Sequence, residues 1–459
     1  MTTRTERDSM GELQVPDAAL YQAQTQRAVD NFQLSNLRLP QRFIQALLQI
    51  KKAAAHANQQ LGLLDNTVAT AIIDAATAQL ANTDMQHYPL DVFQTGSATS
   101  SNMNVNEVLA TLASRALGQK VEPNDHVNLG QSSNDTIPSA IHVSAALAIQ
   151  QQLIPALRQA QAVLINKSQQ IGHIVKTGRT HLMDAMPVSF SQVLGGWQAQ
   201  LAHAELQLQQ QLQQLQQLAQ GGTAVGSGIN ADPRFASLCC QQLSHNTGLD
   251  FRPAENFFSA IATQDTAVAT SGALKTLAVS LLKICNDLRW MNSGPLAGLA
   301  EISLPALQPG SSIMPGKVNP VIPEAVAMIC AQVVGNDSSI TIAGQSGNFE
   351  LNVMLPLVAH NLLQSIALLS TGCKALAEQV ISGFIVHEDN INKALARNPI
   401  LVTALNPLLG YAKAAEIAKQ AYQQQRPVLD VALEHTDYSK EQLQQLLDPA
   451  RLAAGGIIK

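Results

Sequence analysis

The sequence is poor in charged and in aromatic side chains. Of its 459 residues, 13% are charged and 4% are aromatic, whereas about 25% of the residues in a typical soluble domain are charged. Lys and Arg together number 28 against 33 for Asp and Glu, which gives a net charge of −5. A nucleic-acid-binding protein usually carries a basic patch, so we expect no nucleic-acid partner. So few charges on so long a chain predict that other subunits cover much of its helix surface.

Metal-binding cysteine motifs and long apolar runs are also lacking. The sequence has five cysteines, Cys239, Cys240, Cys285, Cys330 and Cys373. None forms a Cys-x-x-Cys pair or a Cys/His set with zinc or iron–sulfur spacing, which predicts buried, reduced thiols and no metal. No 18 apolar residues follow one another without a polar interruption, so we expect no transmembrane helix and no membrane partner. The polar start, residues 1–8, resembles neither a signal nor a transit peptide, and a cytoplasmic protein is predicted.

Long segments with helical periodicity occupy the middle of the chain. Between Trp197 and Gln220 there is no Gly or Pro, and leucines recur at steps of three, four or seven residues, which is typical of a helix with one buried stripe. Further long helices are predicted over residues 139–171 (with a kink at Pro155), 266–292, 322–342 and 357–381. Helices of this length predict a mainly α fold with a central bundle of long helices. We expect three domains, with residues 1–131, 132–388 and 389–459.

One of the loops between these rods has the composition of an anion cradle. In Gly310–Pro320, two glycines and two prolines flank a Ser pair, Lys317 and Asn319. Glycine permits backbone angles that turn several N–H groups toward one point, Lys adds a charge and Asn adds two donors. The loop is not a nucleotide-binding P-loop, because five residues separate its glycines and Val318 follows the Lys. A rigid turn between helices with a solvated Lys is the alternative.

A second loop, Lys176–Asp184, contains a histidine suited to acid–base chemistry. His181 follows Arg179 and Thr180, and a His beside a carboxylate can transfer protons near neutral pH. Asp184 and Glu324 are the candidate carboxylates, and the sequence alone does not choose between them or exclude a structural His.

Two other loops, Thr95–Asn102 and Gln131–Pro138, are rich in hydroxyl and amide side chains. The second has the composition of a helix start, with Ser, Asn and Asp before a Pro in the first turn. The free N–H groups and hydroxyls of such a start either cap the helix or bind a carboxylate.

Together these groups suit acid–base chemistry on a small carboxylate. Removal of a proton from the carbon next to a carboxylate places a second negative charge on that group. Preorganised N–H groups, a Lys and an Asn would stabilise this charge as it develops. A Ser within the cradle could act as the base if its hydroxyl were strongly acidified there.

Gly310–Pro320 resembles the signature of the fumarase/aspartase superfamily, and nearly the whole chain is similar to the class II fumarases. The other matching segments are residues 8–11, 23–27, 94–97, 101–104, 131–135, 178–181, 221–225 and 347–352. The resemblance implies a three-domain fold with a central long-helix bundle, and a homotetramer whose active sites combine loops of three subunits. It also implies reversible hydration of fumarate to (S)-malate in the citric acid cycle, with no cofactor and no metal.

The resemblance also assigns roles to individual residues. Ser311 matches the catalytic Ser that acts on the carbon acid, His181 matches the residue that handles the proton of the water, and Glu324 matches its carboxylate partner. The residues that match the substrate-binding set are Ser97, Ala98, Thr99, Ser132, Ser133, Asn134, Thr180, Ser312, Lys317, Val318 and Asn319. An older assignment makes His181 the base instead, and the sequence does not decide between the two.

The sequence departs from the family at a second anion site. The family often has a His-Pro-Asn-Asp run there, and the matching residues are Glu122, Pro123, Asn124 and Asp125. An acid in place of His should weaken anion binding at that site. Ala98 replaces a common Gly in the first substrate loop.

Two alternative functions are weighed beside fumarate hydration. The first is aspartate ammonia-lyase of the same superfamily, because Val321–Glu324 and Leu351–Met354 also resemble aspartases, although Thr180, His181 and Gly316 match fumarases. The second is a non-catalytic helical scaffold, suggested by the Gln-rich rod from Trp197 to Gln220.

Overall fold

The computed structural model describes residues 2–456 and is mainly helical, as predicted. The chain forms two compact units, each built from three separate stretches. Unit 1 contains Met1–Pro155, Ala204–Ala278 and Ile329–Thr371, and unit 2 contains Ala156–His203, Val279–Met328 and Gly372–Lys459. The predicted three-domain division, with boundaries near 131 and 388, stays a prediction.

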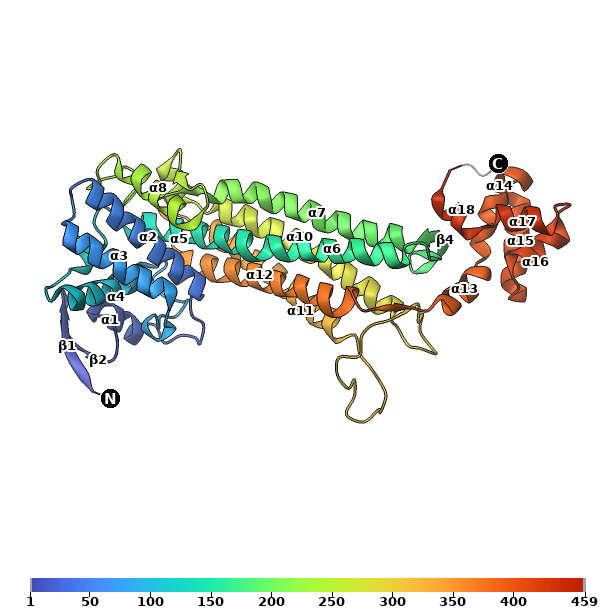
Figure 1. The fold of residues 1–459 in the computed structure, drawn as a ribbon, viewed down its shortest axis with the longest axis horizontal. Coiled ribbons are helices and arrows are strands. Elements are labelled where there is room, and N and C mark those ends of the chain that lie inside the picture. The colour runs from blue at the N-terminus through green and yellow to red at the C-terminus, as the bar shows by residue number, and fades with distance from the viewer. Residues whose placement is uncertain (1, 457–459) are drawn as a thin grey trace. The chain divides into compact units, whose positions relative to one another are not determined.

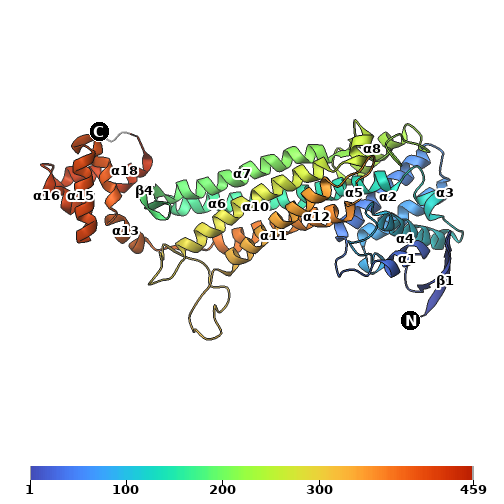
Figure 2. The same cartoon turned by 180° about the vertical axis from the view of Figure 1, so that it is seen from behind.

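Five long helices contribute to the two units (Figures 1 and 2). They are α6 (Ile154–Ile171), α7 (Phe190–Leu215), α10 (Asp265–Met291), α11 (Val321–Gly344) and α12 (Leu355–Leu376). Helix α6 is the second part of the helix predicted over residues 139–171. The other four each correspond to a predicted helix, with the largest shifts in α7. That helix begins before Gly195 and Gly196, where a Cβ would contact nothing within 4 Å. It ends at Leu215, just before Gln217–Leu218 (β5) pairs in parallel with Arg252–Pro253 (β6).

The expected kink at Pro155 takes the form of a π-helical turn. Helix α5 (Ser133–Ala148) continues through the π turn Ile149–Leu153 into α6. Proline has no N–H to donate and its ring clashes with the carbonyl four residues earlier. The wider π turn directly before Pro155 relieves that clash within a continuous helix.

Three helical stretches are long and apolar enough to cross a membrane by length and composition alone, namely Ser133–Ile171, Asp265–Met291 and Val321–Gly344. The expectation of no transmembrane helix rested on the lack of an uninterrupted apolar run and stays a prediction. Between α10 and α11 in unit 1, Asp337 accepts hydrogen bonds from Ser271 (2.8 Å) and Lys275 (2.6 Å). These polar contacts show α10 and α11 packing against each other.

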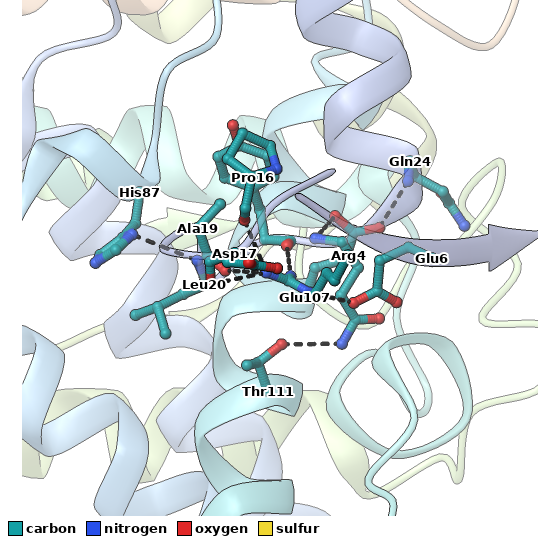
Figure 3. Close-up of polar contacts among 12 residues, drawn as sticks. Arg4, Glu6, Pro16, Asp17, Ala19, Leu20, Gln24, His87, Glu107 and Thr111 are labelled. Carbon is teal, nitrogen blue, oxygen red and sulfur yellow. Dashed lines mark hydrogen bonds and ion pairs between the residues drawn. The ribbon is translucent and has the colours of Figure 1, made fainter. Parts of the chain in front are cut away.

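Unit 1 also contains the amino-terminal elements and two short helices from the middle of the chain. They are β1 (Thr3–Asp8), β2 (Gly11–Pro16), α1 (Ala23–Asn31), α2 (Gln41–Gln60), α3 (Asn66–Ala81), α4 (Thr99–Leu117), α8 (Phe235–Thr247) and α9 (Phe257–Ala262). Strands β1 and β2 form an antiparallel hairpin. Figure 3 shows Arg4 beside Pro16 and Ala19, to whose carbonyls its guanidinium donates. The guanidinium also donates to the Tyr21 carbonyl.

The same region contains a buried carboxylate that caps a helix distant from it in the sequence. Gln22, the N-cap residue of α1, makes no capping bond with its own side chain. Glu107 of α4 instead accepts from the backbone N–H groups of Gln22, Gln24 and Thr25 at 2.8–3.1 Å. Glu107 and Gln24 are labelled in Figure 3. A carboxylate at this position accepts hydrogen bonds from the free N–H groups and interacts favourably with the positive end of the helix dipole.

Unit 2 contains a second hairpin and the carboxy-terminal helices. Strands β3 (Val175–Thr180) and β4 (Met183–Ser189) pair antiparallel, as do the two-residue strands β7 (Ile302–Ser303) and β8 (Ile385–Val386). The helices are α13 (Glu388–Ala396), α14 (Asn406–Leu409), α15 (Tyr411–Gln424), α16 (Val428–His435), α17 (Lys440–Leu446) and α18 (Pro449–Ala454). Leu405, Ile417, Val431 and Leu443 are at the centre of their own apolar cluster, which explains why the tail has shorter amphipathic segments.

Candidate active site

The signature loop Gly310–Pro320 lies in unit 2 and is closed at its base. The Gly310 N–H donates to the Lys317 carbonyl at 2.8 Å, and the Asn319 side chain donates to the Gly310 carbonyl at 2.6 Å. A Cβ on Gly310 would lie 2.2 Å from the Lys317 carbonyl oxygen, so only glycine fits there. Gly316 has a φ of +83°, which is a left-handed conformation that favours glycine. Gly316 therefore has the special backbone angle expected of it, whereas Gly310 is required for lack of space and not for its backbone angle.

The Ser311 hydroxyl oxygen accepts two backbone hydrogen bonds within this loop. The N–H groups of Ile313 and Met314 lie 3.2 and 3.0 Å from Ser311 Oγ. Donors aimed at a hydroxyl oxygen stabilise the negative charge that it gains on losing its proton. This arrangement favours Ser311 as the acidified hydroxyl within the cradle.

A cavity of about 1340 Å³ adjoins the carboxy-terminal half of the signature loop. Lys317, Val318, Asn319 and Glu324 of the predicted set line it. Sequence reasoning did not identify two further basic residues on its wall, Arg289 and His387. No motif marks either residue: Arg289 is near the end of α10 and His387 directly precedes α13. The Ser303 hydroxyl and His387 Nε2 are 2.6 Å apart.

His181 lies in the turn of a β-hairpin, where the sequence had predicted an irregular loop. Thr180 pairs with Met183, so His181 and Leu182 are the two central residues of the turn, with φ values of +55° and +61°. Two positive φ values correspond to a type I′ turn, which normally selects Asn-Gly or similar pairs. Non-glycine residues in this conformation are strained, and such strain concentrates at functional sites.

A buried ion cluster supports the His181 hairpin. The Glu301 carboxylate lies 3.0 Å from Lys176 Nζ and 2.7 Å from the Arg179 guanidinium. Glu301 and Lys176 are buried, and Arg179 is half-buried. Burial lowers the pKa of the Lys176 ammonium, and the Glu301 carboxylate opposes this shift. The shared carboxylate therefore neutralises two cations of β3 directly before His181.

We expect Glu301→Gln to lower the free energy of unfolding by about 2 kcal/mol. Removing one partner of a fully buried pair typically costs about 3–5 kcal/mol, and the partial exposure of Arg179 reduces this cost. Urea denaturation of the two proteins measures the difference. The matched control is Glu434→Gln, which breaks the exposed pair with Arg426 and should cost less than about 1 kcal/mol. Equal losses in the two variants would contradict a special role for the buried cluster.

The predicted His181–Glu324 pair is not formed within one chain. Both side chains are exposed. Among the described residues, no hydrogen bond or ion pair joins His181 to Glu324 or to Ser311. Asp184, the other candidate carboxylate, is on β4 and likewise makes no ion pair with His181 in residues 2–456.

Unit 1 contains the other predicted substrate residues, on two adjacent loops. Ser97 Oγ and Thr99 Oγ1 are 2.8 Å apart at the start of α4. Between them, Ala98 has a φ of +53°, a conformation that explains the preference for Gly at this position. The Asn102 amide donates to Ser133 Oγ at 3.3 Å, which connects this loop to the start of α5.

The start of α5 is capped, which was one of the two expected roles, but Pro138 lies inside the helix and not in its first turn. Ser132 Oγ accepts from the Asn134 N–H, and the Asp135 carboxylate accepts from the Ser132 N–H. The second Asp135 oxygen accepts from the N–H groups of Gly221 and Thr223, each at 2.9 Å. Capping occupies part of the polar surface of this loop, and Ser132 and Asn134 remain half-buried.

The residues of the second anion site form a separate local structure. Pro123–Val127 is a π-helical turn, and Glu122 precedes it. The Glu122 carboxylate lies 2.7 Å from Lys120 Nζ. An acid paired in this way offers no attraction to an anion, so the expectation of weak anion binding here is a prediction that still stands.

Comparisons with known proteins agree over almost the whole chain. Residues 11–335 match a family described as Lyase, and residues 401–454 match one described as Fumarase C C-terminus. The chain is 64% identical over 455 residues to fumarate hydratase class II 2 of Pseudomonas aeruginosa, with 99% of each chain covered. It is 56% identical over 454 residues to fumarate hydratase class II of Xylella fastidiosa, covering 99% of this chain and 96% of the other. The class II fumarase structure from Schistosoma mansoni aligns with a TM-score of 0.96 at 36% identity, covering 98% and 99% of the two chains.

Proposed function

The chain belongs to the class II fumarases of the fumarase/aspartase superfamily, and we propose that it catalyses the reversible hydration of fumarate to (S)-malate. The enzyme is a hydro-lyase that works by acid–base chemistry, and we place the reaction in the citric acid cycle and in the cytoplasm. The observation that carries the chemistry is the closed signature loop, in which two backbone N–H groups point at Ser311 Oγ.

In the malate-to-fumarate direction, Ser311 Oγ takes a proton from the carbon next to one carboxylate. The electron pair of the broken C–H bond moves onto that carboxylate, which then carries a second negative charge. Lys317 and Asn319 stabilise this charge as it develops, and such preorganised donors usually make the largest contribution to catalysis. The electron pair then returns from the carboxylate to form the second bond between the two carbons as the C–O bond breaks. The leaving hydroxide receives a proton from His181, so that fumarate and water are formed.

We propose that the other residues matched by the resemblance hold the substrate through hydroxyl, amide and backbone groups. They are Ser97, Ala98, Thr99, Ser132, Ser133, Asn134, Thr180, Ser312 and Val318. When the carboxylates at both ends of the substrate are bound, its reacting carbons are positioned against the catalytic groups. Positioning of this kind contributes several kcal/mol to catalysis.

We also propose that the enzyme is a homotetramer. Helix α11 exposes Met328, Val334 and Ile342, with 69%, 40% and 58% of their surfaces accessible within a single chain. Large apolar side chains left exposed on a long helix favour a surface that is covered by another protein. Association would also explain why His181 and Glu324 are both exposed and apart within one chain. Sedimentation tests this proposal, and a monomer at micromolar concentration would contradict it.

The decisive assay for the proposed function follows fumarate by its ultraviolet absorbance. The purified protein is incubated with malate and, separately, with aspartate. Fumarate should form from malate and not from aspartate. Formation from aspartate alone would indicate an ammonia-lyase, and inactivity with both compounds would refute the proposal.

A further inference from the structure

Lys51 of α2 is a completely buried lysine, with none of its surface accessible. Its ammonium group donates to Asn128 Oδ1 at 2.9 Å and to Gln131 Oε1 at 3.0 Å. Both partners are neutral amides, and no carboxylate is hydrogen-bonded to it among residues 2–456. Burying an amine without an ion-pair partner is costly, and burial lowers the pKa of Lys51 to about 7. A simple packing role would be filled better by an apolar side chain of the same length.

The partners of Lys51 connect the two substrate loops of unit 1. Asn128 Oδ1 accepts a hydrogen bond from Lys51 and also from the amides of Asn102 and Asn106, each at 3.1 Å. The Asn128 amide in turn donates to the Gln131 carbonyl at 3.1 Å. Asn102 lies in the first turn of α4, directly after the loop that carries Ser97 and Thr99. Asn128 therefore joins the start of α4 to the start of α5, and Lys51 fixes Asn128 through the hydrogen bond to its side-chain oxygen.

Gln131 is the last residue before the predicted substrate residues 132–134. Its side-chain oxygen is held by Lys51, and its side-chain nitrogen donates to the carbonyls of Val127 and Leu129 at 3.1 and 3.3 Å. On the other side of the loop, the buried Asp135 is held by the N–H groups of Gly221 and Thr223. Ser132, Ser133 and Asn134 thus lie between two fixed points, of which Lys51 supplies one.

We infer that Lys51 is a positioning residue for dicarboxylate binding: through Asn128 and Gln131 it fixes the Ser132–Asn134 loop relative to the Ser97–Thr99 loop. This role rests on the proposed function, because it concerns the same substrate. Lys51 touches neither the substrate nor the reacting atoms in this scheme, and it acts only through the two amides.

The test is Lys51→Met, which removes both hydrogen bonds and keeps the length of the side chain. We expect the KM for malate and for fumarate to rise at least tenfold, while kcat changes less than fivefold and the melting temperature does not fall. The matched control is Lys52→Met, the same change at the next residue, which is half-buried and makes no hydrogen bond or ion pair in residues 2–456. Its KM should stay within twofold of the wild type.

If the wild type is active and the KM of Lys51→Met is normal, the role of Lys51 is refuted and the proposed function remains intact. Wild-type protein inert with both substrates would refute the proposed function itself. If Lys51→Met does not fold, Gln131→Met carries the test, because it removes one acceptor of Lys51 and leaves the lysine in place. A KM unchanged in a folded Gln131→Met protein would then overturn the inference.

Lys51 should also make the stability of the fold depend on pH. Between pH 7 and about 10.5 the unfolded chain keeps a proton on this lysine and the folded protein has lost it, so stability rises with pH in this window. Asp135 of α5 and Cys239 of α8 face Lys51, and both act to raise its pKa. From pH 8 to pH 9, the unfolding equilibrium constant of the wild type should fall about tenfold relative to that of Lys51→Met. Parallel pH profiles from urea denaturation would contradict the burial of a titrating amine.

Discussion

Ser311→Ala should lower kcat for the conversion of malate to fumarate by a factor of about 100 to 10,000, the usual size of a general base contribution. The substitution removes the oxygen on which the N–H groups of Ile313 and Met314 converge. Without it, no other hydroxyl in the loop has two backbone donors to stabilise its deprotonated form. Steady-state rates of fumarate formation measure the effect, and melting temperatures verify that the loop change leaves the fold intact.

The neighbouring Ser312 provides the matched control. Its side chain is exposed, and among residues 2–456 its hydroxyl makes no hydrogen bond. As a substrate-binding residue it should change KM more than kcat when replaced by Ala. If Ser311→Ala kept near-normal turnover, or if the two variants lost kcat equally, Ser311 would not be the base.

His181→Asn should cause a loss of similar size, about 100-fold to 10,000-fold in kcat, because the variant has no group that can protonate the leaving hydroxide. Asn tolerates the left-handed conformation better than most residues. The substitution therefore keeps the turn at φ +55° while removing the imidazole. The rate of fumarate formation and circular dichroism of the variant separate loss of chemistry from loss of structure.

Leu182→Gly is the control for the hairpin. Leu182 occupies the second central position of the turn, with φ +61° and 65% of its surface exposed. Glycine adopts this conformation without strain, so the variant should retain turnover within a few-fold of the wild type. If His181→Asn kept full activity, the enzyme would require the conformation of the turn and not the imidazole.

The two variants together decide which residue is the base. If Ser311 removes the carbon-bound proton, His181→Asn should still exchange that proton of malate with solvent deuterium, while water loss is slow. Ser311→Ala should abolish both processes. The opposite pattern, with exchange lost only in His181→Asn, would support the older assignment of His181 as the base. Proton NMR of malate in deuterium oxide follows the exchange directly.

Local sequence patterns are sufficient to predict the helical class, the five long helices and the composition of the polar loops. These features depend on local periodicity and on residue chemistry: the leucine repeat between Trp197 and Gln220 and the glycines at 310 and 316 act over a few residues. The signature loop could be recognised for the same reason, since its closure joins residues that are close together in the chain.

Contacts between segments that are distant in the sequence become visible only in the folded chain. Nothing near His181 in the sequence indicates a hairpin, because His-Leu is an unfavourable pair for a type I′ turn, and strand pairing imposes that conformation. Glu301 is more than one hundred residues from Arg179, and Lys51 is 77 residues from Asn128, so no local pattern reveals either contact. A buried charge acquires its role from the groups that the fold brings within hydrogen-bonding distance, and that distance is a property of the folded chain alone.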